Sequence, residues 1–356
     1  MFSLALFTLA LSAALSLAGP AKRAPALEVS LSAPANVASI DEIKITAAVT
    51  NTGSEDVKVL KYGTVLDGAL ATRSFKVSKG GVEADFIGIK LQIDMSLAGD
   101  SAFVVIPAGE TILVEHDVAP LFDFEALGAG SFEFEPLTTF QVVDEDARPN
   151  AYKVSVKTLK VNVKSDVQKR ELRAIDKRAV VSCSSSSMAS FISASYTEGK
   201  SLASIASSYI ASNGANSLFR SYFGSSSTSS VRSVLNAVAN ENSSSRTLNC
   251  SDPYGVCGSG VIAYTLISGS RPIYYCSIFY NEVATSRLCS GTTVASRNVR
   301  GGTTLHELTH AASNTGDVGY GCAYDMSLAA SSPSSALSNA DNYNCFATQV
   351  YQNTQC

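Results

Sequence analysis

The first half of the chain alternates apolar and polar residues as half-buried β-strands do, because successive side chains of a strand point to opposite faces. Five segments show the alternation: residues 27–31, 43–47, 57–60, 103–106 and 152–156. Turn-forming residues separate them, among them Asn51-Thr52-Gly53 and Lys79-Gly80-Gly81. Several short strands separated in this way predict an antiparallel, sandwich-like all-β region.

In the second half the apolar residues change to helical spacing, as at Phe191, Ile192 and Ile205. The predicted elements are helices over 188–211 and 231–238, strands over 260–265 and 272–279, a helix through 306–310, a loop, and a terminal helix over 340–350. The fold class expected for the chain is therefore two domains, an all-β domain followed by a mainly α (α+β) domain.

Residues 1–19 are an apolar run that ends in the small residues Ala18 and Gly19. The run is too short to cross a bilayer comfortably, so it predicts a cleaved secretory signal, an extracellular protein and no membrane partner. The cysteine count agrees, since an even number in an exported chain indicates disulfides. The eight cysteines all lie in the second half: Cys183, Cys250, Cys257, Cys276, Cys289, Cys322, Cys345 and Cys356.

The segment His306-Glu307-Leu308-Thr309-His310 places two imidazoles four residues apart, on one helix face, where both can bind one metal ion. Glu307 lies beside the first imidazole and can take a proton from a water that zinc activates for attack on a peptide carbonyl. The third histidine, His116, is expected on the surface of the strand-rich half. The motif predicts a zinc-dependent endopeptidase.

A catalytic zinc usually has three protein ligands. No His follows His310 and no Glu follows Glu307, so the third ligand is sought among Asp317, Asp325 and Asp341, or in principle a cysteine. Asp317 is favoured because glycines around it allow a tight turn back to the helix. In the alternative, Asp341 is the third ligand and Asp317 supports the ligands from behind.

Residues 306–310 and 314–321 together resemble the deuterolysin family of fungal neutral metalloproteases, also called aspzincins or peptidase family M35. The second motif of that family is G-T-x-D-x-x-Y-G, and Asn314 stands here at the position of its first Gly. Residues 249–257 and 339–343 are similar as well. The resemblance implies a zincin-type protease fold with one zinc ion per chain, held by His306, His310 and Asp317.

The same resemblance assigns Glu307 as the general base and Tyr320 as a hydrogen-bond donor to the oxyanion. It places Asp341 on the S1′ side of the cleft, where a carboxylate would favour basic protein substrates such as histones and protamines. The disulfide pairs that it implies are Cys183–Cys250, Cys257–Cys276 and Cys289–Cys356, which leaves Cys322 and Cys345 as an additional pair.

Dibasic pairs lie at the border between the two halves, and in a secreted chain an exposed pair is a processing site. Cleavage after Lys177-Arg178 by a dibasic-processing protease would divide the chain into a signal peptide (1–19), a β-rich propeptide (20–178) and a zinc metalloprotease catalytic domain (179–356). The propeptide is expected to keep the protease inactive, either through an acidic side chain or by covering the cleft. It has no cysteine that could bind the metal.

The net charge of −4 gives no electrostatic support for a nucleic-acid partner. We expect a monomer that acts on proteins and peptides. The alternative, from another functional class, is a non-catalytic secreted binding protein in which a zinc ion is structural.

Overall fold

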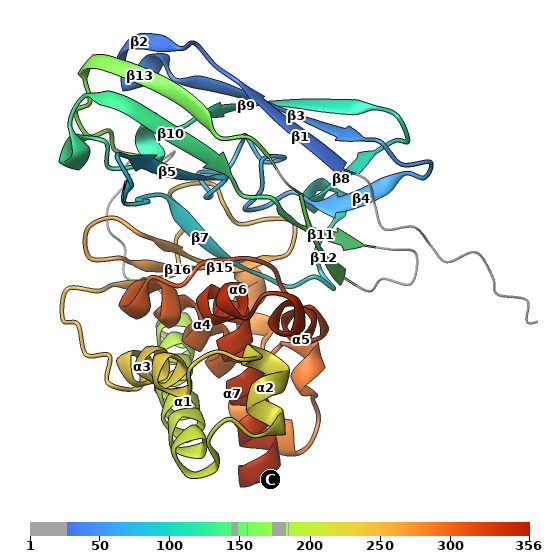
Figure 1. The fold of residues 1–356 in the computed structure, drawn as a ribbon. Helices are drawn as coiled ribbons and strands as arrows, with labels where there is room; N and C mark the ends of the chain where they lie inside the picture. The colour runs from blue at the N-terminus through green and yellow to red at the C-terminus, as the bar shows by residue number, and fades with distance from the viewer. Residues whose placement is uncertain (1–26, 144–148, 155, 173–182, 184) are drawn as a thin grey trace, which may run out of the picture.

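The computed structural model describes residues 27–143, 149–154, 156–172, 183 and 185–356. The expected signal peptide (1–19) and the dibasic pair Lys177-Arg178 lie outside these residues. A strand-rich part, built by the first half of the chain, lies on a helical part built by the second half (Figure 1). Within the described ranges, none of the helices combines the length and apolarity that crossing a membrane requires.

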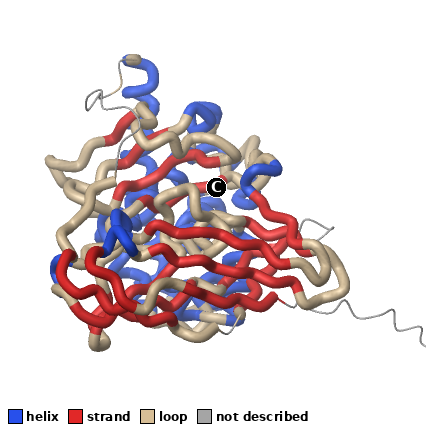
Figure 2. The backbone as a smooth tube through the Cα atoms, turned by 90° about the horizontal axis from the view of Figure 1, so that it is seen from above, coloured by secondary structure: helices blue, strands red, loops and turns tan. Residues whose placement is uncertain are grey.

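The strand-rich part consists of three small sheets, which overlie the helices when seen from above (Figure 2). Their strands in spatial order are β1 (Leu27–Ser32), β3 (Lys44–Asn51) and β9 (Thr111–Asp117); β2 (Asn36–Ser39), β13 (Leu159–Asp166), β10 (Gly130–Pro136), β5 (Phe75–Lys79) and β6 (Val82–Glu83); and β12 (Pro149–Lys153), β11 (Thr139–Val143), β4 (Val57–Leu60) and β8 (Phe103–Ile106). The predicted antiparallel pairing is found, for example, between β1 and β3, but β2 runs parallel to β13.

Alternating burial builds the core of this part. In β3 the apolar residues Ile45, Ala47 and Val49 are fully buried, while their neighbours in sequence are partly exposed. The expectation that His116 is a surface residue is wrong. Its imidazole is buried, lies edge-on to Phe75 at 5.0 Å and hydrogen-bonds through Nε2 to the Val65 carbonyl at 3.0 Å. It is a core histidine with its polar atom satisfied.

The helical part contains the helices α1 (Ser186–Asn213), α2 (Ser217–Phe223), α3 (Thr228–Ala239), α4 (Arg300–Ser313), α5 (Cys322–Ser331), α6 (Pro333–Ser338) and α7 (Ala340–Gln355). The mixed α+β character of the fold is thus as predicted, and so are α1, α3, α4 and α7. The region expected as a loop contains α5 and α6. Both are short and rich in Ser and Ala, so no apolar stripe marks them in the sequence.

Helix α4 lies at the centre of the helical part, and every residue from Gly301 to Ala311 is buried. Glycines bring α1 unusually close to it. A Cβ atom on Gly199 of α1 would lie only 3.0 Å from the Gly301 carbonyl oxygen and from the Leu305 amide nitrogen. The glycine contact therefore fixes the helix that carries the predicted motif against the longest helix of the fold.

The fourth sheet joins the two halves of the chain. Its strands in spatial order are β14 (Leu248–Asn249), β16 (Ile273–Tyr275), β15 (Val261–Leu266) and β7 (Ile89–Ile93). β7 belongs to the strand-rich half by sequence, yet it pairs antiparallel with β15 of the helical half. The division into a separate propeptide and catalytic domain did not foresee this shared sheet.

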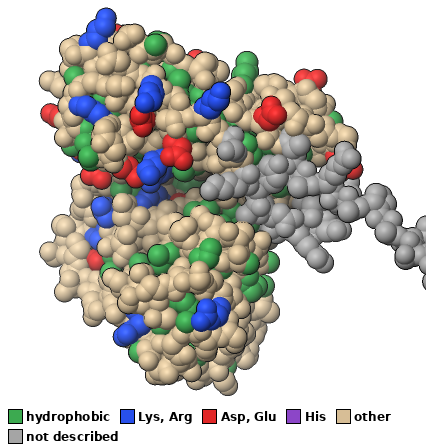
Figure 3. Space-filling model, in the orientation of Figure 1, with side chains coloured by type: hydrophobic (Ala, Val, Ile, Leu, Met, Phe, Trp, Pro, Cys, Tyr) green, Lys and Arg blue, Asp and Glu red, His purple; other side chains and the backbone are tan. Residues whose placement is uncertain are grey.

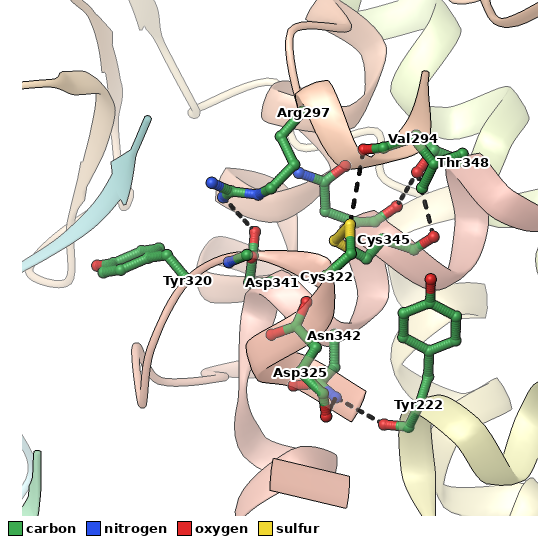
Figure 4. The surroundings of a disulfide bond; sticks show 12 residues. Tyr222, Val294, Arg297, Tyr320, Cys322, Asp325, Asp341, Asn342, Cys345 and Thr348 are labelled. Carbon is green, nitrogen blue, oxygen red and sulfur yellow. Dashed lines mark hydrogen bonds and ion pairs between the residues drawn. A yellow bond between two sulfur atoms is a disulfide. The ribbon is translucent and has the colours of Figure 1, made fainter. Parts of the chain in front are cut away.

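All eight cysteines are paired, as Cys183–Cys250, Cys257–Cys276, Cys289–Cys356 and Cys322–Cys345. The first three are the pairs that the family resemblance implied, and the fourth is the expected additional pair. The last of them joins the start of α5 to α7 directly after the glycine-rich segment 314–321 (Figure 4). It therefore restrains the chain at the end of the segment that contains Asp317.

We predict that the Cys322→Ala/Cys345→Ala variant loses about 3 kcal/mol of the free energy of unfolding, since removing a cross-link of this loop length frees the unfolded chain. Denaturant titration followed by circular dichroism measures the loss. The Val82→Ala variant is a control, because that side chain is 59% exposed. Equal midpoints for the double variant and the unaltered protein would contradict the prediction.

Candidate metal centre

Helix α4 presents His306, Glu307 and His310 inside the protein, and the chain then returns on itself. Asn314 ends the helix in the left-handed conformation (φ 57°), which asparagine tolerates better than most residues other than glycine. This explains the departure from the family motif, because the position requires a positive φ that either Gly or Asn can adopt. The turn brings Asp317 back to the helix.

Three side-chain atoms converge at this point. His306 Nε2 lies 3.0 Å from His310 Nε2, and Asp317 Oδ1 lies 3.1 Å from each of them. Two imidazole nitrogens and one carboxylate oxygen form a donor set that zinc prefers. The residues present therefore fit one metal ion.

Among the described residues one other group has metal-ligand geometry, formed by Cys322, Asp325 and Cys345. Both of its sulfur atoms belong to the disulfide, so neither can act as a thiolate ligand. Asp325 is thus not part of the site, and the structure brings Asp317 to the two histidines.

The far ring nitrogens of the histidines are held by groups behind them. His310 Nδ1 hydrogen-bonds to the Thr315 carbonyl at 2.9 Å, which leaves Nε2 as the lone-pair donor. His306 Nδ1 faces Asp341 Oδ1 at 3.6 Å. Asp341 therefore lies behind the first histidine and is not placed as a third ligand.

Arg297 is a site residue that the sequence analysis missed. Its buried guanidinium hydrogen-bonds to Asp341 Oδ1, and the Gly321 amide donates to Asp341 Oδ2 at 2.6 Å (Figure 4). The negative charge of Asp341 is thus paired with a cation inside the protein. No motif marks Arg297, which precedes α4 in an irregular segment.

Glu307 is fully buried beside the ligands. The Thr265 hydroxyl donates to its Oε2 at 2.6 Å, and its Oε1 has no hydrogen-bond partner among the described residues. Burial raises the pKa of the Glu307 carboxyl to about 8.

Burial and neighbouring charged groups shift the pKa values of the ligand side chains. Burial disfavours the charged form of His306, yet Asp317 and Asp341 outweigh it and raise the pKa of His306 to about 9. For Asp317 burial is likewise opposed by the two histidines, which lower the pKa of its carboxyl below the usual range. The aspartate is therefore held as an anion, the form that binds a cation.

The ring of Tyr320 is stacked on that of His306, with the two ring centroids 6.3 Å apart. Burial raises the pKa of its hydroxyl well above the usual value, so this group stays a proton donor. It donates to the Leu91 carbonyl of β7 at 3.0 Å. The backbone of Tyr320 is clamped by Gln141, which accepts from its N–H at 2.9 Å and donates to its carbonyl at 2.8 Å.

We predict that Asp317→Asn loses nearly all bound zinc, whereas Asp341→Asn keeps measurable zinc with an affinity about 10–100-fold weaker, the usual effect of altering a group behind a ligand. Metal content per chain, measured after dialysis against buffers of fixed free zinc, separates the two. Full zinc content in Asp317→Asn together with its loss in Asp341→Asn would reverse the assignment.

Comparisons with known proteins show the family to which the chain belongs. The family model described as the deuterolysin metalloprotease (M35) family matches residues 1–356. A neutral protease 2 homolog of Aspergillus terreus is 35% identical over 321 residues, which cover 86% of this chain and 87% of that protein. A peptidyl-Lys metalloendopeptidase of Armillaria mellea is 30% identical over 375 residues and 98% of both chains.

A solved structure, a zinc peptidase from Grifola frondosa, is similar with 26% identity and a TM-score of 0.39, and the match covers 46% of this chain and 96% of that one. The family model and the similar proteins are all metalloproteases, which contradicts the alternative of a non-catalytic binding protein. The chain belongs to the deuterolysin (M35) family of metalloproteases and is a metalloendopeptidase.

Proposed function

We propose that the protein is a secreted zinc endopeptidase whose single zinc ion is held by His306, His310 and Asp317. The observation that carries the proposal is the convergence of two Nε2 atoms and one carboxylate oxygen within 3.1 Å of one another. When bound, zinc lowers the pKa of a water molecule and polarises the carbonyl of the peptide to be cut.

The general base is Glu307. The Thr265 hydrogen bond fixes one carboxylate oxygen, so the other, Oε1, is available to accept the proton of the attacking water. Its raised pKa supports the second half of the task, the delivery of that proton to the leaving amine.

Tyr320 stabilises the negative charge that develops on the carbonyl oxygen. Its hydroxyl already donates to a peptide carbonyl, that of Leu91, and burial keeps it protonated. A donor that is fixed before the reaction needs no reorganisation in the transition state.

The substrates are proteins and peptides, with basic proteins such as histones and protamines as the expected class. The S1′ role of Asp341 requires an accessible carboxylate, and the buried Arg297 pairs with that carboxylate. Other groups of the cleft therefore recognise the basic residues of the substrate. The protein acts as an extracellular monomer, produced with a signal peptide over 1–19.

We predict that Glu307→Gln lowers kcat on casein or histone by about 10²–10⁴-fold, the usual contribution of a general base, and leaves the zinc content unchanged. Val82→Ala serves as the matched control for expression and handling. Full hydrolysis by the Glu307→Gln protein would refute the assignment of the base.

We further predict that the secreted enzyme is a zymogen activated after Lys177-Arg178, so that the active form begins at Ala179. Amino-terminal sequencing of the purified active protein identifies this residue. Activity in a chain that still begins at Leu27 would exclude activation by removal of the propeptide.

A further inference from the structure

β7 differs from the other strands of the first half, since all five of its residues are buried. It does not belong to the three sheets of that half and forms the outermost strand of the sheet of the helical half, next to β15. Leu91 lies opposite Tyr264, and Lys90 lies opposite Thr265. Without β7 this edge of β15 would present unpaired N–H and carbonyl groups, which is how sheets bind extended peptides.

The peptide groups of Leu91 lie in the metal centre itself. The Leu91 carbonyl oxygen is 3.1 Å from His306 Nε2 and accepts the Tyr320 hydroxyl at 3.0 Å. The Leu91 N–H donates to Asp317 Oδ2 at 2.8 Å. A carbonyl that meets both a metal-binding histidine and the oxyanion donor occupies the position required of the carbonyl under attack.

The residues on either side of Leu91 are held as well. Arg297 Nη1 donates to the Ile93 carbonyl at 2.8 Å, two residues beyond Leu91. On the other side Lys90 is 5% exposed, and its ammonium donates to the Thr315 carbonyl at 2.6 Å and to Asn314 Oδ1 at 2.7 Å. These acceptors lie at the carboxyl end of α4, where the helix dipole also favours a cation.

One cavity lies alongside β7, and another lies beyond its carboxyl end. The first, of about 200 Å³, lies beside Lys90 and Asp317, with walls from both halves of the chain. The second, of about 300 Å³, lies beyond Ile93, between Asp94 and Glu282. In the space-filling view the molecule narrows where the two parts meet, and acidic and basic side chains gather along this groove (Figure 3).

We propose that β7 occupies the substrate cleft in the position of a peptide substrate, with Leu91 as the residue whose carbonyl would be attacked. The cleft thus takes an extended peptide antiparallel to β15. Arg297 binds the peptide carbonyl two residues beyond that point. The Asn314–Thr315 acceptors form a subsite for a Lys or Arg side chain directly before it. This inference rests on the proposed function.

The inference names the chemical class of the preferred substrate. A basic residue is recognised by neutral oxygen atoms at the end of α4, one position before the residue that supplies the carbonyl. The preference for basic proteins would then come from this subsite and not from Asp341. The same contacts make the intact chain its own inhibitor.

The first test uses the full chain with Lys177 and Arg178 both replaced by alanine, so that the propeptide stays attached. We expect Leu91→Pro to raise hydrolysis of a fluorogenic peptide at least about tenfold, because proline lacks the N–H that Leu91 donates to Asp317. Proline also restricts the backbone of residues 90 and 91 and so loosens the pairing of their strand, which should speed amide exchange in β15 by a similar factor. Lys90→Met, which keeps the buried stem, should give a smaller rise of the same kind. Val82→Pro, at an exposed position of β6, should resemble the parent.

The two readouts separate the possible failures. Unchanged activity and unchanged β15 exchange in both variants, with an active mature enzyme, overturn the placement of β7. Faster exchange without activity in any form of the protein supports the placement and overturns the proposed enzyme function instead.

The second test addresses the basic subsite in the activated enzyme. Peptides with Lys directly before the residue that supplies the cleaved carbonyl should show kcat/KM about tenfold above the same peptides with Met, a difference of ~1.4 kcal/mol. Asn314→Gly keeps the left-handed turn and removes one acceptor, so it should reduce this ratio several-fold. Equal rates on both peptides would refute the subsite.

Discussion

Helix α4 carries two imidazoles, a carboxylate and three threonine hydroxyls through the interior of the protein, and each of these groups must find a partner there. Burying a polar group without one costs several kcal/mol. The segments around α4 supply hydrogen-bond partners for many of these groups. Thr304 hydrogen-bonds to Ser195 of α1 at 2.8 Å, and Thr303 donates to Glu282 at 2.7 Å. The Thr309 hydroxyl donates to the His306 carbonyl of the preceding turn at 2.7 Å.

The same requirement organises the segment after α4. Asn339 accepts from the Val318 amide at 2.9 Å and donates to the Gly319 carbonyl at 3.1 Å, as a further strand would. The disulfide then fixes Cys322 to α7. Asp317 therefore approaches the histidines from a segment held along its length, and the position of the carboxylate does not depend on the ligands alone.

The sequence could predict the elements whose periodicity is strong and the residues whose chemistry is explicit. The helix around His306 and strands such as β1, β3, β4 and β8 belong to this class. Glu307 and its neighbours were predictable because two histidines four residues apart lie on one helix face and can bind one metal ion. The turn at Asn314 could also have been anticipated, since few residues other than Gly and Asn adopt its backbone conformation.

What escaped prediction depends on contacts between distant segments. Residues 89–93 have the composition of any buried strand, and nothing local says that their partner lies about 170 positions away in β15. Arg297 has no motif, because its role comes from Asp341 and Ile93 meeting it in space. The environment of Asp341 could not be foreseen without that arginine. Periodicity describes one element at a time, whereas the cleft is assembled from several.

The pairing of β7 with β15 also fixes an order of events during synthesis. A ribosome completes residues 89–93 long before residues 261–266, so β7 exists before β15, the strand with which it pairs. When the helical half folds, its sheet grows onto an edge that is already present. The edge of β15 that would otherwise present unpaired N–H and carbonyl groups is therefore covered as soon as β15 forms.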